Sequence, residues 1–177
     1  EEAPDAMEEE MGMVAAADAE NERKFNLVTE QKLVTDNLLG KFHPLIAFVV
    51  ANKHGKFGDP LLREAAVLAL CRYMAVSSTV CERYLPLLFT VLQMEPSALV
   101  RTTISIALGD VAFRFPNSLE PWTGHMYARL SDSSTVVRYN ALMTLTHLIL
   151  NDMIKVKGKV SHVVMCLNDP CQKVREL

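Results

Sequence analysis

The chain has 177 residues, half of them apolar, and its 18 basic and 21 acidic side chains give a net charge of −3. This length allows one domain or two, and the apolar share is large enough to fill a core. The longest apolar runs fall short of the roughly 20 residues that a membrane span needs. The acidic N-terminus lacks the apolar centre of a targeting peptide, so we expect neither kind of segment in this sequence.

Residues 1–22 stand apart in composition. They hold nine acidic residues, no basic residue and almost no large apolar side chain besides methionine. Such a segment buries too little surface to offset its ordering entropy, so we expect a mostly disordered acidic linker that becomes helical near its end. A solvated tail without function and a regulatory arm both remain open. Residues 23–177 keep 18 basic and 12 acidic residues, a charge of +6, which suits a surface that contacts phosphates.

Residues 23–177 are predicted to form a series of helices arranged in pairs, preceded by one leading helix at 23–40. The three full pairs are 42–52 and 60–76, 81–94 and 98–115, and 119–130 and 134–151. A truncated fourth pair begins near Lys159 and is cut off at Leu177. No stretch alternates strictly with period two, so no strands are expected.

Arginines recur at a fixed spacing in these pairs. Arg101, Arg138 and Arg175 are 37 residues apart, and each follows a valine. An acidic residue lies six positions before each of them, and for the last two it is Asp132 and Asp169. A self-similar period near 37 residues indicates a repeat architecture.

The second helix of each pair is apolar on more than one side. Residues 134–151 place Val137 on one face and Val136, Met143 and Leu150 on another. An interior helix of stacked repeats touches its own partner and both neighbouring repeats. Because a helix that is apolar almost all round is buried on several sides, we predict that both faces are buried.

The order of helix, Asp-Pro-type turn, Val-Arg and helix resembles the HEAT repeat. The resemblance implies an all-α fold, a HEAT-repeat α-solenoid of the armadillo-like superhelix type. It also implies that the recurring charges stack into a structural ladder along the turn edge. The members of this ladder would be Asp132, Asp169, Arg101, Arg138 and Arg175. Glu95 and Glu64 depart from the pattern, so the ladder is expected to be weakest in the first two units.

Longer segments resemble one family of HEAT proteins. The D2-type non-SMC subunits of condensin contain stretches similar to 146–158 (THLILNDMIKVKG), 109–132 (GDVAFRFPNSLEPWTGHMYARLSD) and the acidic opening at 8–14 (EEEMGMV). Generic HEAT repeats share spacing and apolar positions, but they do not share these motifs in one order. The D3-type subunits of the second condensin complex are the nearest competitor, and the closeness of 109–132 favours the D2 type.

The condensin resemblance implies a scaffold for mitotic chromosome condensation. Its expected partners are the kleisin subunit, the SMC ATPase subunits and double-stranded DNA or chromatin. Its expected location is the nucleus and the chromosomes, with a cytoplasmic phase in part of the cell cycle. The alternative is a transport or adaptor solenoid, or an enzyme-regulatory HEAT subunit, that binds peptides in its groove. Salt-dependent DNA binding would separate the two functions.

Catalytic and metal-binding motifs are not recognisable in the sequence. The four cysteines form no CxxC pair, so buried reduced thiols are the simplest interpretation. His162, Cys166 and Cys171 could form part of a zinc site, but the spacing fits no familiar framework and a fourth ligand is missing. The stretch at 55–58 (GKFG) is too short for a phosphate-binding loop. We therefore expect no enzyme, no cofactor and no small-molecule substrate, and the ATPase of a condensin-like complex would reside in other chains.

Basic residues near the third pair are the candidate contacts for nucleic acid or a protein partner. Lys155, Lys157 and Lys159 lie within five residues after the helix at 134–151, and Arg129 is the fourth candidate. Cations near a helix C-terminus are favoured by the helix dipole, so the lysines could form a solvated, dipole-matched loop. They could equally contact phosphates or a partner, and both interpretations remain open.

Overall fold

The computed structural model describes residues 3–35, 37–53, 55–156 and 158–177. Within these ranges it contains helices and no strand, which confirms the predicted all-α class. No helix in the described part of the chain is both long and apolar enough to cross a bilayer. The chain divides into two compact units, Glu1–Phe42 and His43–Leu177, and each is described by itself.

The first unit contains a long helix, α1 (Ala3–Asn26), which continues as a π-helical stretch at Leu27–Thr35. A short 3₁₀ turn follows at Leu38–Lys41, where the side chain of Asn37 accepts a hydrogen bond from the Leu38 N–H. The sequence predicts mostly disorder for residues 1–22 and a new segment from residue 23, whereas the structure has one helix across that boundary. Alanine, glutamate and methionine are strong helix formers, so local propensity explains a helix whose described side chains are nearly all exposed.

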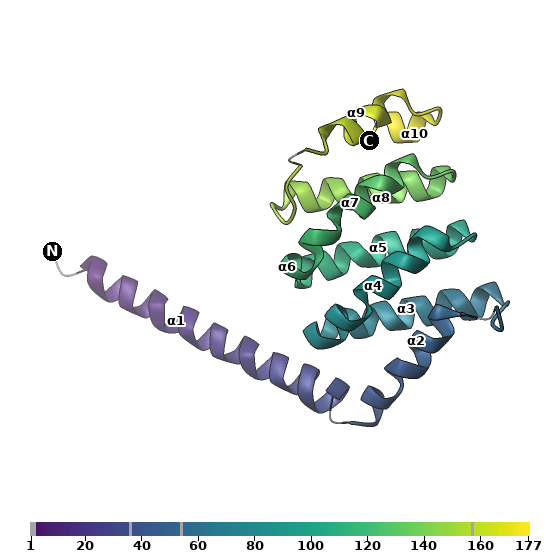
Figure 1. The fold of residues 1–177 in the computed structure, drawn as a ribbon. Helices are drawn as coiled ribbons and strands as arrows, with labels where there is room; N and C mark the ends of the chain where they lie inside the picture. Colours follow the sequence, from purple (N-terminus) through teal and green to yellow (C-terminus); the bar gives the residue numbers. More distant parts are fainter. Residues whose placement is uncertain (1–2, 36, 54, 157) are drawn as a thin grey trace. The chain divides into compact units, whose positions relative to one another are not determined.

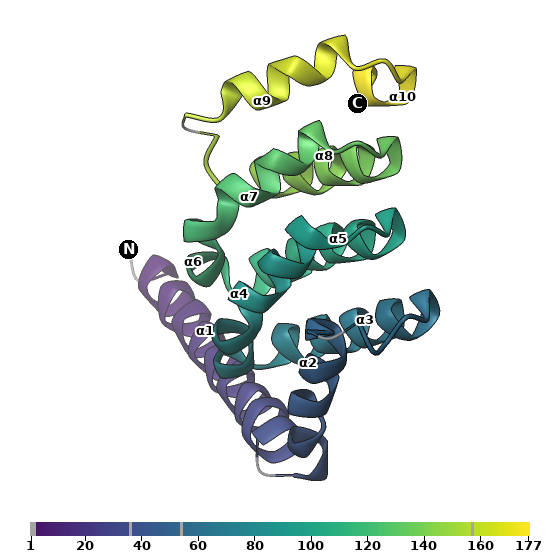
Figure 2. The same cartoon turned by 45° about the vertical axis from the view of Figure 1, so that its right-hand side comes forward.

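The second unit consists of two layers of helices (Figures 1 and 2). One layer contains α3 (Pro60–Val76), α5 (Ala98–Arg114), α8 (Thr135–Leu150) and the short α10 (Gln172–Arg175). The other layer contains α2 (His43–Ala51), α4 (Ser78–Met94), α6 (Pro116–Leu119), α7 (Thr123–Ala128) and α9 (Val160–Met165). Each helix of the first layer lies beside the next one, as the stacking of repeats in a solenoid requires.

Local capping decides where several helices begin. The Asp59 side chain accepts a hydrogen bond from the Leu61 N–H at 3.1 Å, so α3 begins at Pro60 as predicted. Ser77 caps α4 in the same way through the Val80 N–H, and α4 therefore begins three residues before the predicted Cys81.

The predicted single helix at 119–130 is divided in the structure. It consists of α6, a 3₁₀ turn at Glu120–Trp122, α7 and a second 3₁₀ turn at Arg129–Ser131. Pro121 lies at the first break, and proline lacks the N–H that a continuous helix would use there. The apolar period therefore located this segment but did not reveal that it changes direction.

The core lies between the two layers, and equivalent residues of successive repeats fill it. Leu70, Leu108 and Leu145 occupy the same position in α3, α5 and α8, and all three are fully buried. Val137 is also fully buried, as predicted.

The prediction that the second face of α8 is buried is wrong. Val136, Met143 and Leu150 are 58%, 44% and 79% exposed. The partner layer and the neighbouring repeats cover α8 on three sides, because an interior helix of a two-layer stack has no fourth neighbour. Its apolar outer face is therefore open to solvent.

Candidate nucleic-acid and partner interface

Ion pairs connect each repeat of the second unit to the next along the turn edge. Arg101 donates from Nε and Nη2 to the two carboxylate oxygens of Asp132, at 3.0 and 2.7 Å. Arg138 donates in the same bidentate way to Asp169, at 2.6 and 3.0 Å. Arginine and carboxylate are planar groups that match in this geometry, so both pairs are strong and well oriented. These contacts form a ladder whose rungs join residues 31 positions apart.

Backbone carbonyls of the turns take the remaining guanidinium donor. Nη1 of Arg101 donates to the Glu95 carbonyl at 2.8 Å, and Nη1 of Arg138 donates to the Asp132 carbonyl at 2.9 Å. Arg175 repeats the contact with the Asp169 carbonyl at 2.7 Å. Each arginine therefore closes the turn before its own helix and, for Arg101 and Arg138, binds the carboxylate of the next repeat.

A further rung joins Arg63 to Glu95, which the sequence pattern did not include. Arg63 Nη1 donates to Glu95 Oε1 at 2.9 Å, and Nη2 forms an ion pair with Oε2. Glu95 also accepts the Ser97 N–H at 3.2 Å, as Asp132 accepts the Ser134 N–H at 2.9 Å. The longer glutamate thus makes the contacts of the aspartates. The 32-residue spacing of this pair was the signal that could have revealed it.

The ladder shifts the acidity of its carboxyl groups. Burial alone would raise the pKa of Asp132, but the hydrogen bonds from Arg101 and the Ser134 N–H, with the charges of Arg101 and Arg129, lower it below its ordinary value. The hydrogen bond from Arg138 chiefly lowers the pKa of Asp169 and also raises the pKa of Arg138 itself. All three groups therefore stay ionised at neutral pH.

The lysine connection, residues 155–159, follows an ordered helix end. The Asp152 N–H donates to the Ile149 carbonyl and the Met153 N–H to the Leu148 carbonyl, with Asp152 in the left-handed region at φ 56°. This is the Schellman arrangement that ends many helices. Ile154 is buried and anchors the chain, and Lys155 after it is exposed. Lys157 lies outside the described residues.

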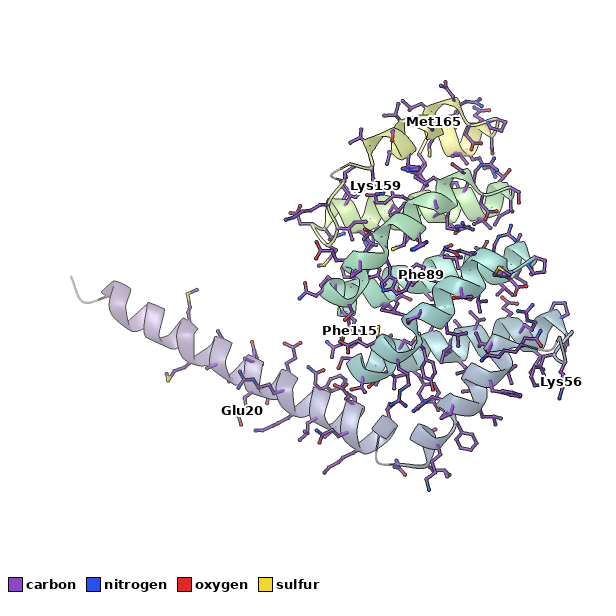
Figure 3. All side chains as sticks on the ribbon, in the orientation of Figure 1. Glu20, Lys56, Phe89, Phe115, Lys159 and Met165 are labelled. Atoms are coloured by element: carbon purple, nitrogen blue, oxygen red, sulfur yellow. The ribbon has the colours of Figure 1, made fainter. Side chains whose placement is uncertain are left out.

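Lys159 comes after Gly158, which has a φ of 77°, and immediately before α9 (Figure 3). Its half-buried side chain reaches Gly124, where an added Cβ would lie 3.6 Å from Nζ. A cation at the start of a helix is not favoured by the dipole. The helix dipole therefore does not explain the position of Lys159. Neither Lys155 nor Lys159 forms an ion pair with the described residues.

Arg129 differs from the lysines because its guanidinium is engaged. Nη1 lies 3.4 Å from the Leu92 carbonyl and 3.4 Å from Asp132 Oδ2, and the side chain is 19% exposed. These contacts favour a role in packing α4 against the following turn over a contact with phosphate.

Packing also accounts for the single tryptophan and the thiols. Trp122 stacks on Phe89 of α4 with ring centroids 4.9 Å apart and planes within 4° (Figure 3 labels Phe89). Burial raises the pKa of Cys71 to about 12 and that of Cys81 to about 11, so both thiols stay protonated. Among the residues that the structure describes, no group of histidines, cysteines and carboxylates could hold a metal ion.

Comparison with known proteins identifies the family of this ladder-linked stack. A family model described as non-SMC mitotic condensation complex subunit 1 matches residues 99–177. Condensin complex subunit 1 of Xenopus laevis is 46% identical over 173 residues, which cover 97% of this chain and 13% of that protein. Condensin-1 complex subunit CAP-D2 of Arabidopsis thaliana is 42% identical over 172 residues, 95% of this chain and 12% of that protein. The chain belongs to the condensin subunit 1 family.

The condensin subunit 1 relatives are much longer than this chain, which spans about an eighth of their length. Identity to the condensin-2 complex subunit CAP-D3 of Arabidopsis thaliana falls to 26% over 119 residues. The difference supports the D2 type that segment 109–132 favours. The family and the HEAT-type helical scaffold expected from the sequence are confirmed.

Proposed function

We propose that this condensin subunit 1 segment is a HEAT-repeat scaffold that binds kleisin and SMC partners and double-stranded DNA during mitotic chromosome condensation. It would act in the nucleus and on chromosomes, with a cytoplasmic phase in part of the cell cycle. It would contribute binding surface, while the ATPase activity of the complex resides in the SMC chains. Family membership supports the complex, and the charge distribution supports the DNA contact.

The observation that carries the DNA contact is the state of the cations. Arg101 and Arg138 of the ladder have guanidinium donors occupied by carboxylates and turn carbonyls. Lys155 is exposed and forms no ion pair with the described residues. Residues 23–177, which include it, have a net charge of +6. Exposed lysines without partners are the groups that can replace the counterions of a phosphate backbone.

The test changes Lys155, Lys157 and Lys159 together to glutamine. Binding to any duplex sequence should weaken about equally, because phosphate contacts carry no base information. Each lost phosphate contact should flatten the slope of log affinity against log salt by roughly 0.9, so the slope changes by up to about three units. Fluorescence anisotropy with two unrelated duplexes over a salt series measures both quantities.

A matched control changes Lys53, Lys56 and Lys173 to glutamine, since these lysines are also exposed. The control removes the same net charge, so a loss as large as that of the first variant would contradict a local site. Unchanged DNA affinity with lost kleisin or SMC binding would make the connection a protein contact. The melting temperature should barely move, because exposed charges contribute little to stability.

The alternative function, an adaptor or regulatory solenoid that binds peptides, is favoured by the exposed apolar face of α8. Such a protein should show little salt-dependent DNA binding, and the same anisotropy measurement therefore separates the two functions.

A further inference from the structure

Two adjacent helices of the second unit expose apolar side chains in register. On each helix the apolar residues are seven positions apart, and equivalent residues on the two helices are 37 positions apart. These residues are Leu99, Ile106 and Phe113 on α5, and Val136, Met143 and Leu150 on α8, and each is between 41% and 79% exposed. Seven residues make about two helical turns, so each set lines one side of its helix from end to end.

A hollow of about 300 Å³ lies lengthwise between α5 and α8, and we call it the α5–α8 groove. Ile106, Phe113 and Met143 contribute its apolar walls. Its floor contains Gly109, where an added Cβ would lie 2.7 Å from Cγ2 of Thr144. The missing side chain therefore lets the two helices approach each other and leaves a trough between their outer faces.

The α5–α8 groove carries one negative charge. Asp110 lines it and is exposed, and its carboxylate makes no hydrogen bond or ion pair with the residues that the structure describes. His147 lines the opposite wall, with its ring centroid 5.1 Å from that of Phe113. A ligand that fills the trough would meet apolar surface along its length and a carboxylate near the middle.

We propose that the α5–α8 groove binds an amphipathic helix of a partner protein, with a lysine or arginine opposite Asp110. Two neighbouring helices with seven-residue apolar spacing present the surface into which the stripe of a third helix packs. Leu99 and Phe113 are 14 positions apart, which is about 21 Å along the helix axis, so the bound helix is about four turns long. Residues 1–22 of this chain contain no lysine or arginine, so they cannot supply the positive charge opposite Asp110. The proposal uses none of the candidate DNA-contacting lysines and does not depend on them.

The test uses three fluorescein-labelled synthetic peptides of about 15 residues, which matches the length of the groove. The first is a helix with leucines along one stripe and a lysine at the centre of its length. The second has glutamate in place of that lysine, and the third has two prolines that prevent helix formation. Anisotropy titrations against the whole 177-residue chain should show that the lysine peptide binds more tightly than the other two.

Two variants locate the binding site. Ile106→Gln with Met143→Gln should weaken the lysine peptide about tenfold, because the apolar walls are lost. Asp110→Lys should reverse the preference between the lysine and glutamate peptides, by about threefold in each direction. The matched control, Leu61→Gln with Leu167→Gln, removes exposed apolar residues outside the groove and should change nothing.

Three results would overturn the proposal. The control could weaken binding as much as the groove variant does, which would mean general apolar adhesion. The proline peptide could bind as tightly as the helical one, which would mean that the surface takes an extended segment. The Asp110→Lys variant could leave the preference between the lysine and glutamate peptides unchanged. Asp110 is exposed, and circular dichroism checks that this variant is folded.

Discussion

At the scale of single residues, the arginines and the lysines of this segment differ in how they are bound. Arg101 and Arg138 each bind a carboxylate with two donors and a turn carbonyl with a third. Guanidinium groups suit such fixed, multiply bonded positions, whereas the lysine ammonium is a compact charge on a flexible stem. The segment thus uses arginine to join its repeats, whereas Lys155 is exposed and forms no ion pair with the described residues.

The ladder carboxylates should make stability depend on acid. The pKa values of Asp132 and Asp169 lie below their ordinary value of 3.8 in the folded chain. Their contribution is therefore complete above pH 3.8 and is lost as the pH falls from there through the lower folded pKa values. The free energy of unfolding, measured with urea at a series of pH values, should drop steeply in this window.

The double variant Asp132→Asn, Asp169→Asn provides the comparison for this acid dependence. It should be less stable at pH 7, because two arginines lose their charged partners, and its stability should fall less between pH 4 and pH 2 than that of the parent chain. Parallel curves for the two proteins below pH 3.8 would show that other carboxyl groups account for the acid sensitivity.

At the scale of elements, the contact between α5 and α8 depends on one glycine. Gly109→Ala should destabilise the chain by about 1 kcal/mol, since overpacking against Thr144 exceeds the gain that alanine gives a helix. Thr144→Ser removes the methyl group that lies 2.7 Å from the added Cβ. In that background Gly109→Ala should become stabilising. Chemical denaturation of the four proteins in the cycle measures this change of sign, and an equal loss in both backgrounds would refute a local clash.

The sequence predicts the elements of the solenoid well where local signals mark them. The helices predicted at 60–76 and 98–115 are α3 and α5 to within one residue, because Asp59 or a Pro-containing turn precedes each. The break at Pro121 was missed because the apolar period continues across it. Exposure of Met143 could not be predicted, since a helix that is apolar on every side does not reveal which side lacks a neighbour.

The candidate site was predictable in part for a related reason. The 37-residue spacing brought out Arg138 and Asp169. It also placed Glu95 six residues before Arg101, but as a departure from the aspartate pattern that was expected to weaken the ladder. Spacing also indicated the lysines as one group. The structure separates Lys155, which is exposed, from Lys159, which lies beside Gly124 on a neighbouring element. Such placement depends on how repeats pack, which no local pattern contains.

At the scale of the whole molecule, the acidic residues 1–22 should oppose DNA binding. Deleting them removes nine negative charges and changes the net charge from −3 to +6. If these acidic residues compete with DNA phosphates for the basic residues of 23–177, the deletion tightens DNA binding. The effect should be strongest at low salt, where screening is weak. Anisotropy at two salt concentrations measures the effect.

A second variant of the chain, in which every Asp and Glu of residues 1–22 is replaced by Asn or Gln, separates the effect of charge from the effect of segment length. It should bind DNA as tightly as the deletion does. Unchanged affinity of the deletion at low salt would mean that this segment is a linker or that it contacts another subunit.

The ladder also bears on how the segment responds to mechanical tension. Its rungs join residues only 31 or 32 positions apart and connect each repeat to the next in series. A force along the stack would act on every rung. Each ion pair would break after a small separation of its two groups, because its hydrogen bonds are directional. We therefore expect the stack to lengthen one repeat at a time under tension and to shorten again on release, because each rung joins only one repeat to the next.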